Sequence, residues 1–159
     1  MSPVTVTLRP PQPADYASVI TLIEEAGLPT AGITEDLDGF MIAVAGNDVI
    51  GAAGLERYGT DGLLRSVVVT PSLRSTGVGG ALVESLLGMA RRAGLKEVYL
   101  LTETAEAYFP RHGFAPVPRG EVPESVKGSV EFQGACSESA MVMHRSLAPR
   151  RSGSGRRSV

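Results

Sequence analysis

A continuous apolar run leads into a glycine-bearing loop and then into a long amphipathic pattern in the middle of this chain. The run Leu63–Val69 is too uniformly apolar to be half exposed, so we predict a central strand there. Thr70-Pro71 ends the strand, and the following loop reads Arg-x-x-Gly-x-Gly from Arg74 to Gly79. Apolar residues then recur at helical spacing as far as Arg92. A strand, a loop and a helix in this order predict a mixed α/β domain.

The loop and the start of the helix have the features of an anion site. Glycines let the backbone approach a ligand closely, and the first N–H groups of a helix have no intrahelical partner. Arg74 adds a cation, so we predict a pyrophosphate or another phosphate-rich ligand; the alternative is a glycine turn needed only for tight packing. A Walker loop is excluded because Gly80-Ala81 replaces its Lys-Ser/Thr pair, and a dinucleotide fingerprint is excluded because Leu82 replaces its last glycine.

Periodicity elsewhere predicts further strands and helices on both sides of this unit. Alternating or continuous apolar runs between turn residues predict strands, and apolar residues at i, i+3 and i+4 predict helices. We expect strands over residues 4–9, 40–45, 49–55, 98–101, 114–117 and 140–147, and helices over 15–26, 78–92, 104–112 and, in pieces, 124–127.

Length and charge narrow the class of protein. The 159 residues fit one domain, which we place at 1–148, followed by a basic low-complexity tail at 149–159 that we expect to be disordered, with a contact arm as the alternative. Residues 1–149 hold 11 basic and 17 acidic side chains, which argues against a nucleic-acid partner. No apolar run is long enough for a membrane helix, and the start has no signal-peptide pattern. The lone Cys136 suggests a cytoplasmic protein without a cysteine-built metal site.

The central unit resembles the GCN5-related N-acetyltransferases (GNATs), whose acetyl-CoA motif is Arg/Gln-x-x-Gly-x-Gly/Ala between a central strand and a helix. Residues 97–102 look like the next strand of that family, and Ala105-x-x-x-Phe109-x-x-x-Gly113-Phe114 looks like its following helix and Gly-Phe strand start. The resemblance covers about residues 4–147 and is specific over 65–114. It implies a mixed, mostly antiparallel sheet of six or seven strands, splayed between its central pair, with helices on both faces.

The resemblance also implies a cosubstrate, acetyl-CoA, and no metal. Backbone groups of the central strand would bind the pantetheine arm, and the loop with the first helical N–H groups would hold the pyrophosphate. The residues implied are Val67, Val68, Val69, Arg74, Ser75, Thr76, Gly77, Val78, Gly79 and Gly80.

Three residues are candidates for proton transfer. Many GNATs carry a tyrosine general acid four residues before the Gly of Gly-Phe, but this chain has Phe109 there and Tyr108 one residue earlier, about 100° around a helix. Tyr108 is therefore either the general acid in place of the usual tyrosine or a half-buried aromatic residue whose hydroxyl contacts solvent. Glu103 is a candidate base or a first-turn acid that suits the helix dipole, and Glu56 is a rival base. His112 suits a helix C-terminus, with catalysis as the minor alternative.

Polar residues near the splayed strand ends are candidates for the acceptor site. Arg65 interrupts an apolar strand, so it either pairs with a structural carboxylate or faces an anionic substrate. Thr102 and Thr104 fall at the C-terminal end of the next strand, where open α/β sheets bind ligands, and Ser66 adjoins Arg65.

Residues 64–69, 99–105 and 117–123 look like the acetyltransferases of arsenic-resistance operons and, more distantly, the catalytic domain of N-acetylglutamate synthase. Cys136-Ser137 departs from the usual Cys-Pro of the first group, and one thiol weighs against arsenic chelation. The implied activity is acetyl transfer from acetyl-CoA to the amine of a small amino-acid-like substrate, arsenic-containing in one version, by direct attack in a ternary complex. The alternatives are an enzyme that acetylates glutamate or a related amino acid, and a non-catalytic protein that binds acetyl-CoA as a sensor or partner subunit. We expect a monomer or homodimer.

Overall fold

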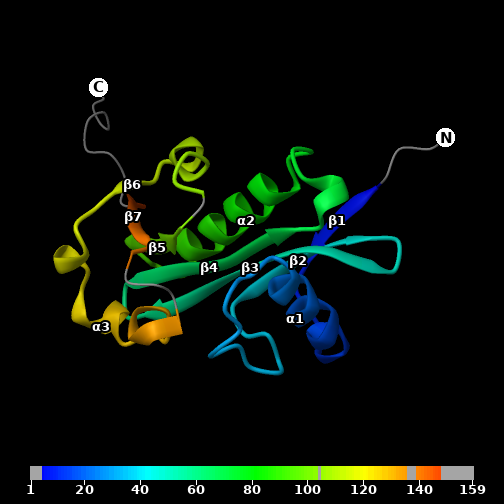
Figure 1. Ribbon diagram of the computed structural model, residues 1–159, viewed down its shortest axis with the longest axis horizontal. Coiled ribbons are helices and arrows are strands. Elements are labelled where there is room, and N and C mark those ends of the chain that lie inside the picture. The colour runs from blue at the N-terminus through cyan, green and yellow to red at the C-terminus, as the bar shows by residue number, and fades with distance from the viewer. Residues whose placement is uncertain (1–4, 104, 136–138, 148–159) are drawn as a thin grey trace.

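A seven-stranded sheet organises the protein, in the order β1-β2-β3-β4-β5-β7-β6 (Figure 1). The computed structural model describes residues 5–103, 105–135 and 139–147. All neighbouring strands are antiparallel except β4 and β5, which are parallel. The predicted mixed, mostly antiparallel sheet is confirmed. The strands are β1 Val6–Arg9, β2 Phe40–Ala45, β3 Asp48–Tyr58, β4 Asp61–Val69, β5 Glu97–Thr102, β6 Ala115–Pro116 and β7 Met141–Ser146.

Helices cover both faces of the sheet, as predicted (Figure 1). Alternate strand residues point to opposite faces, so Ile42 packs in the cluster that holds α1, and Ala43 packs in the cluster that holds α2. The α-helices are α1 Tyr16–Glu25, α2 Val78–Arg92 and α3 Glu124–Lys127, and 3₁₀ turns lie at Pro13–Asp15, Pro71–Leu73, Phe109–His112 and Arg119–Glu121. Glu131–Ala135 is an irregular turn in which Gln133 and Gly134 leave helical geometry.

The central parallel pair separates along its length. Hydrogen-bonded register between β4 and β5 runs from Asp61 opposite Glu97 to Leu64 opposite Leu100 and stops there. Beyond that point β4 stays paired with β3, and β5 stays paired with β7. The predicted splay is thus present, and it opens a cleft between two strands that are each held from the far side.

An extra residue in β4 sits where the strands separate. Ala52 pairs with Val68 and Gly54 with Arg65, so one residue of β3 lies opposite two residues of β4, Ser66 and Val67. Ser66 adopts a φ of 59°, in the left-handed region. This β-bulge shifts the alternation of the strand. Leu64 and Val67, three residues apart, therefore both pack in the cluster that includes α2.

The prediction of a helix over residues 104–112 is wrong, because the helical turn in the structure is much shorter. Only the 3₁₀ turn Phe109–His112 forms, with Pro110 in its first turn, because proline donates no N–H to extend a helix backwards. The strand expected over 114–117 is likewise reduced to Ala115–Pro116. Thr104, Cys136 and the predicted tail at 149–159 lie outside the described residues. Among the described residues, no helix is long and apolar enough to cross a membrane.

Candidate active site

A cavity of about 1220 Å³ occupies the cleft between the separated strands. Backbone and side chains of β4 form one wall, and the end of β5 forms the other. The loop before α2 closes one end. The sequence-predicted residues that line it are Arg65, Ser66, Val67, Val68, Val69, Arg74, Ser75, Gly77, Gly79, Gly80, Thr102, Glu103 and Tyr108.

The loop before α2 exposes backbone N–H groups to the cavity. Ser75 and Gly77 both have left-handed φ values, 68° and 92°, and Gly77 is the N-cap of α2. The first N–H groups of a helix have no intrahelical partner, and at α2 no side chain caps them. Arg74 is exposed, and its Nε lies 3.3 Å from the carbonyl of Val69. The loop thus combines free N–H groups, a helix dipole and a cation, which together suit an anion.

Two residues of the set predicted to bind acetyl-CoA, Thr76 and Val78, do not line this cavity. The hydroxyl of Thr76 donates to the carbonyl of Leu73 and holds the loop together. Val78 is buried in the core beneath the first turn of α2. Their contribution to a ligand site is limited to their backbone.

Tyr108 and Phe109 occupy different environments. Phe109 is buried and meets Phe114 edge-on, with ring centroids 5.9 Å apart. The Tyr108 hydroxyl lies against the first turn of α2, where a Cβ added to Gly79 would be 3.3 Å from it. Burial raises the pKa of the Tyr108 phenol, so the hydroxyl stays protonated at neutral pH and can donate a proton into the cleft.

The end of β5 contributes one free carboxylate and one hydroxyl with a local role. Glu103 is exposed and lines the cavity. Thr102 is buried, and its Oγ1 accepts a hydrogen bond of 2.9 Å from the backbone N–H of Ala105. Thr102 therefore fixes the turn that follows β5.

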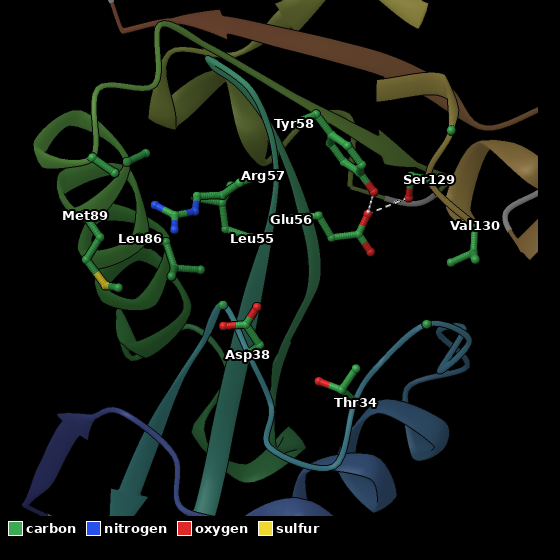
Figure 2. A pocket seen from close by; sticks show the side chains of 15 residues that line it. Thr34, Asp38, Leu55, Glu56, Arg57, Tyr58, Leu86, Met89, Ser129 and Val130 are labelled. Carbon is green, nitrogen blue, oxygen red and sulfur yellow. Dashed lines mark hydrogen bonds between the residues drawn. The ribbon is translucent and has the colours of Figure 1, made fainter. Parts of the chain in front are cut away.

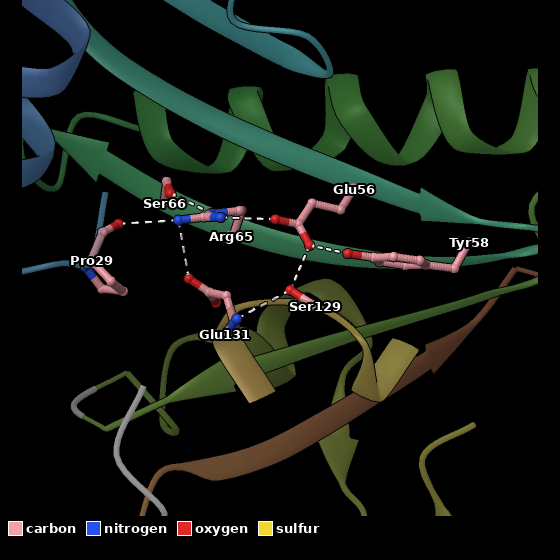
Figure 3. A network of polar contacts seen from close by, with 7 residues as sticks. All are labelled: Pro29, Glu56, Tyr58, Arg65, Ser66, Ser129 and Glu131. Carbon is pink, nitrogen blue, oxygen red and sulfur yellow. Dashed lines mark hydrogen bonds and ion pairs between the residues drawn. The ribbon is translucent and has the colours of Figure 1, made fainter. Parts of the chain in front are cut away.

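Arg65 lies at the centre of a buried polar network (Figure 3). Its side chain is 1% exposed; Nη1 lies 2.8 Å from Glu56, and Nη2 lies 3.4 Å from Glu131. Nη2 also donates to the carbonyl of Pro29 at 3.2 Å, and Nε to the hydroxyl of Ser66 at 3.1 Å. The guanidinium is therefore already paired with two carboxyl groups.

Glu56 belongs to this network rather than to the cofactor cleft. Burial alone would raise the pKa of Glu56, but hydrogen bonds from Ser129, Tyr58 and Arg65 outweigh it and hold the pKa below its ordinary value. The hydroxyls of Tyr58 and Ser129 both lie 2.6 Å from Oε1. A carboxylate so fully bonded stays ionised and has little capacity left to take a proton from a substrate.

A second cavity of about 760 Å³ lies on the far side of Glu56 (Figure 2). Glu56, Tyr58, Asp38 and Ser129 line it. Arg65 lines the first cavity and contacts Glu56, which lines the second. The Arg65–Glu56 pair thus forms part of the wall between the two cavities.

Sequence reasoning missed Glu131, Ser129 and Tyr58. A buried arginine requires a carboxylate, so Arg65 signalled that an acid lies nearby, but nothing in the weakly periodic stretch 118–136 identified which one. In the part of the chain that the structure describes, no cluster of three metal-ligating side chains occurs.

The family model described as "Acetyltransferase (GNAT) domain" matches residues 36–116, about half of the chain. The amino-acid acetyltransferase of Enterobacter sp. (strain 638) is 32% identical over 100 residues, and that of Escherichia coli (strain K12) is 31% identical over 100 residues. Each alignment covers 62% of this chain and 23% of the relative, so the chain spans about a quarter of the length of these relatives.

Solved structures share the fold. N-acetylglutamate synthase from Neisseria gonorrhoeae, complexed with coenzyme A and N-acetyl-glutamate, superposes with a TM-score of 0.78 at 21% identity, over 93% of this chain and 36% of that one. Rv2747 from Mycobacterium tuberculosis, in complex with CoA and NLQ, gives a TM-score of 0.74 at 21% identity, over 89% of this chain and 99% of that one.

Proposed function

Because this chain belongs to the acetyltransferase (GNAT) domain family, we propose that it transfers the acetyl group of acetyl-CoA to the amine of a small amino-acid-like acceptor. One observation carries the proposal: the cleft opened by the separation of β4 and β5 is continuous with the glycine loop at the start of α2. A ligand with a pyrophosphate at one end and a reactive group at the other matches this layout.

The residues of the cleft fit acetyl-CoA. Arg74 and the N–H groups of Gly79 and Gly80 suit its phosphates. The edge of β4 that β5 leaves unpaired suits the amides of its pantetheine arm. When bound, acetyl-CoA supplies the activated thioester, and the chain supplies position and charge.

Three groups have roles in our mechanism. The β-bulge at Ser66 and Val67 lies beside the cleft, and in our mechanism a backbone N–H there polarises the thioester carbonyl. Glu103 accepts the proton of the acceptor ammonium through water, since it is exposed beside the cleft. Tyr108 donates its hydroxyl proton to the leaving thiolate. Holding the amine next to the thioester is the largest contribution that a ternary complex makes.

The amino-acid class of acceptor is supported by the names of the relatives, "Amino-acid acetyltransferase", and by the N-acetyl-glutamate in a similar structure. We assign Arg65, Ser66 and Thr102 to the acceptor side because they line the same cleft. An acidic acceptor group would have to share Arg65 with Glu56 and Glu131. No comparison or contact supports an arsenic-containing acceptor, which enters only as one member of the test panel.

Thiol release tests the proposal. Purified protein is incubated with acetyl-CoA and a panel of amino acids, simple amines and organoarsenicals, and free CoA is measured together with acetyl-CoA affinity by calorimetry. Saturable binding with turnover on an amino acid supports the proposal. Saturable binding without turnover on any acceptor would replace it with the sensor alternative, and absence of binding would reject both.

A further inference from the structure

Three side chains form a hydrogen-bonded chain from the cleft to the protein surface. The Tyr108 hydroxyl lies 3.3 Å from Nε2 of His112, and Nδ1 of His112 lies 2.8 Å from Oε2 of Glu84 on α2. The side chain of His112 is 13% exposed, whereas that of Glu84 is 50% exposed. The Tyr108 hydroxyl is thus connected through the imidazole of His112 to a carboxylate that is exposed to solvent.

Two glycines on the first turn of α2 leave room for the side chains of Tyr108 and His112. A Cβ at Gly79 would lie 3.3 Å from the Tyr108 hydroxyl, and a Cβ at Gly80 would lie 3.3 Å from Cε1 of His112. Both rings therefore pack directly on the backbone that faces the cofactor cleft. Glu84, one turn further along α2, holds the imidazole through Nδ1.

The chemistry of the partners fixes the direction of each hydrogen bond. A carboxylate only accepts, so Nδ1–H of His112 donates to Glu84. When the imidazole is neutral, Nε2 accepts a hydrogen bond from the Tyr108 hydroxyl, so the hydroxyl proton of Tyr108 points away from the cleft. In an imidazolium Nε2–H donates to the Tyr108 oxygen, and the Tyr108 proton is free to point into the cleft.

We propose that His112 and Glu84 are positioning residues that orient the Tyr108 proton towards the leaving thiolate and replace it after transfer. This inference rests on the proposed acetyl transfer. The S–H bond of CoA forms as the O–H bond of Tyr108 breaks, and the phenolate oxygen takes the proton from Nε2 of His112. The neutral imidazole then regains a proton from solvent, which balances the proton that the acceptor ammonium gives up.

Several charged groups surround the imidazole and the phenol. Glu84 faces Nδ1, and Arg145 of β7 donates to the His112 carbonyl at 2.7 Å and lies 3.9 Å from Glu84. Arg111 lies 5.9 Å from the centre of the Tyr108 ring. Glu84 is the carboxylate that contacts the ring, so its charge is the one to remove in a test.

The pH dependence of CoA release provides the test, with Glu84→Gln as the main variant. Glutamine keeps a hydrogen-bond acceptor for Nδ1 but removes the charge that stabilises an imidazolium. We expect the alkaline limb of the rate profile to move to lower pH, with unchanged acetyl-CoA affinity. Glu24→Gln is the matched control because it removes the same charge from an exposed site on α1, and its profile should equal that of the wild type.

Repeating the Glu84→Gln substitution in a Tyr108→Phe protein separates the proton relay of Tyr108, His112 and Glu84 from a general loss of stability. Tyr108→Phe should slow CoA release on the order of 100-fold, and adding Glu84→Gln to it should produce no further shift. Identical profiles for the wild type and Glu84→Gln, or the same shift in both backgrounds, would overturn the relay. Absence of CoA release by the wild type would instead overturn the proposed function, and the relay with it.

Discussion

Arg65 and Glu56 form an ion pair of 2.8 Å although they are not cross-strand partners: Arg65 pairs in register with Gly54, and Glu56 with Leu63. The diagonal contact is available because both side chains point to the face that carries Glu131 and Ser129 (Figure 3). The same face of the sheet also carries α1 and the short helix α3. The contacts that Arg65 makes with Glu131 and Glu56 with Ser129 tie the hairpin of β3 and β4 to the segment 128–131.

Removing Arg65 should destabilise the protein strongly. Arg65→Met fills similar space but leaves two carboxyl groups without their guanidinium, which costs about 3 kcal/mol or more for a buried network. Urea unfolding at pH 7 measures the change. Arg57→Met is the matched control because Arg57 is exposed on the same hairpin, and it should change the unfolding free energy by less than about 0.5 kcal/mol. Equal losses in the two variants would contradict the network.

The ion pair also predicts a pH dependence of stability. The folded pKa of Glu56 is lowered from its ordinary 4.5, so the carboxylate contributes stability that is complete above that ordinary value and is lost as pH falls through the folded value. The difference in unfolding free energy between the wild type and Glu56→Gln should therefore be constant from pH 7 to about 6 and shrink below about 4.5. A difference that stays constant down to pH 3 would show that Glu56 is not held ionised.

Arg74 should contribute to acetyl-CoA affinity and little to folding. Its side chain is exposed at the mouth of the loop, so we expect Arg74→Ala to weaken binding roughly tenfold through loss of a charge-assisted contact, with an unchanged melting temperature. Calorimetric titration at low and moderate salt measures the effect, which should diminish as salt rises. Unchanged affinity would reject the anion site at this loop.

Gly77 should be required for its backbone conformation alone. A Cβ at this position meets nothing within 4 Å, but its φ is 92°. Gly77→Ala should therefore cost about 1–2 kcal/mol of stability by strain and also weaken acetyl-CoA binding. Gly120→Ala, where a Cβ also meets nothing and no such φ occurs, is the control and should be neutral. Thermal unfolding with and without acetyl-CoA compares the two.

The unit from β4 to α2 was predictable because its signals are local. The uniform apolar run, the glycines and the helical spacing each act within a few residues, and Gly77 does adopt the positive φ that a glycine loop allows. The bulge was not predictable because Ser66 takes its left-handed φ of 59° without a glycine to signal it. The partners of Arg65 were also hidden, because Glu131 is brought to it by tertiary packing of a segment without periodicity. The 104–112 helix failed because Pro110 outweighed a good apolar spacing.

The extra residue in β4 limits how this chain can change during evolution. Deleting one residue at the bulge, such as Ser66, would restore regular alternation and leave Leu64, Val67 and Val69 facing α2, but it would remove the distorted backbone beside the cleft. A one-residue insertion or deletion elsewhere in β4 would instead turn every residue beyond it to the opposite face, whereas substitutions affect one side chain at a time. Homologous domains should therefore vary in residue type along β4 while insertions and deletions accumulate in connections such as 26–39 and 118–136, which the strand register does not constrain.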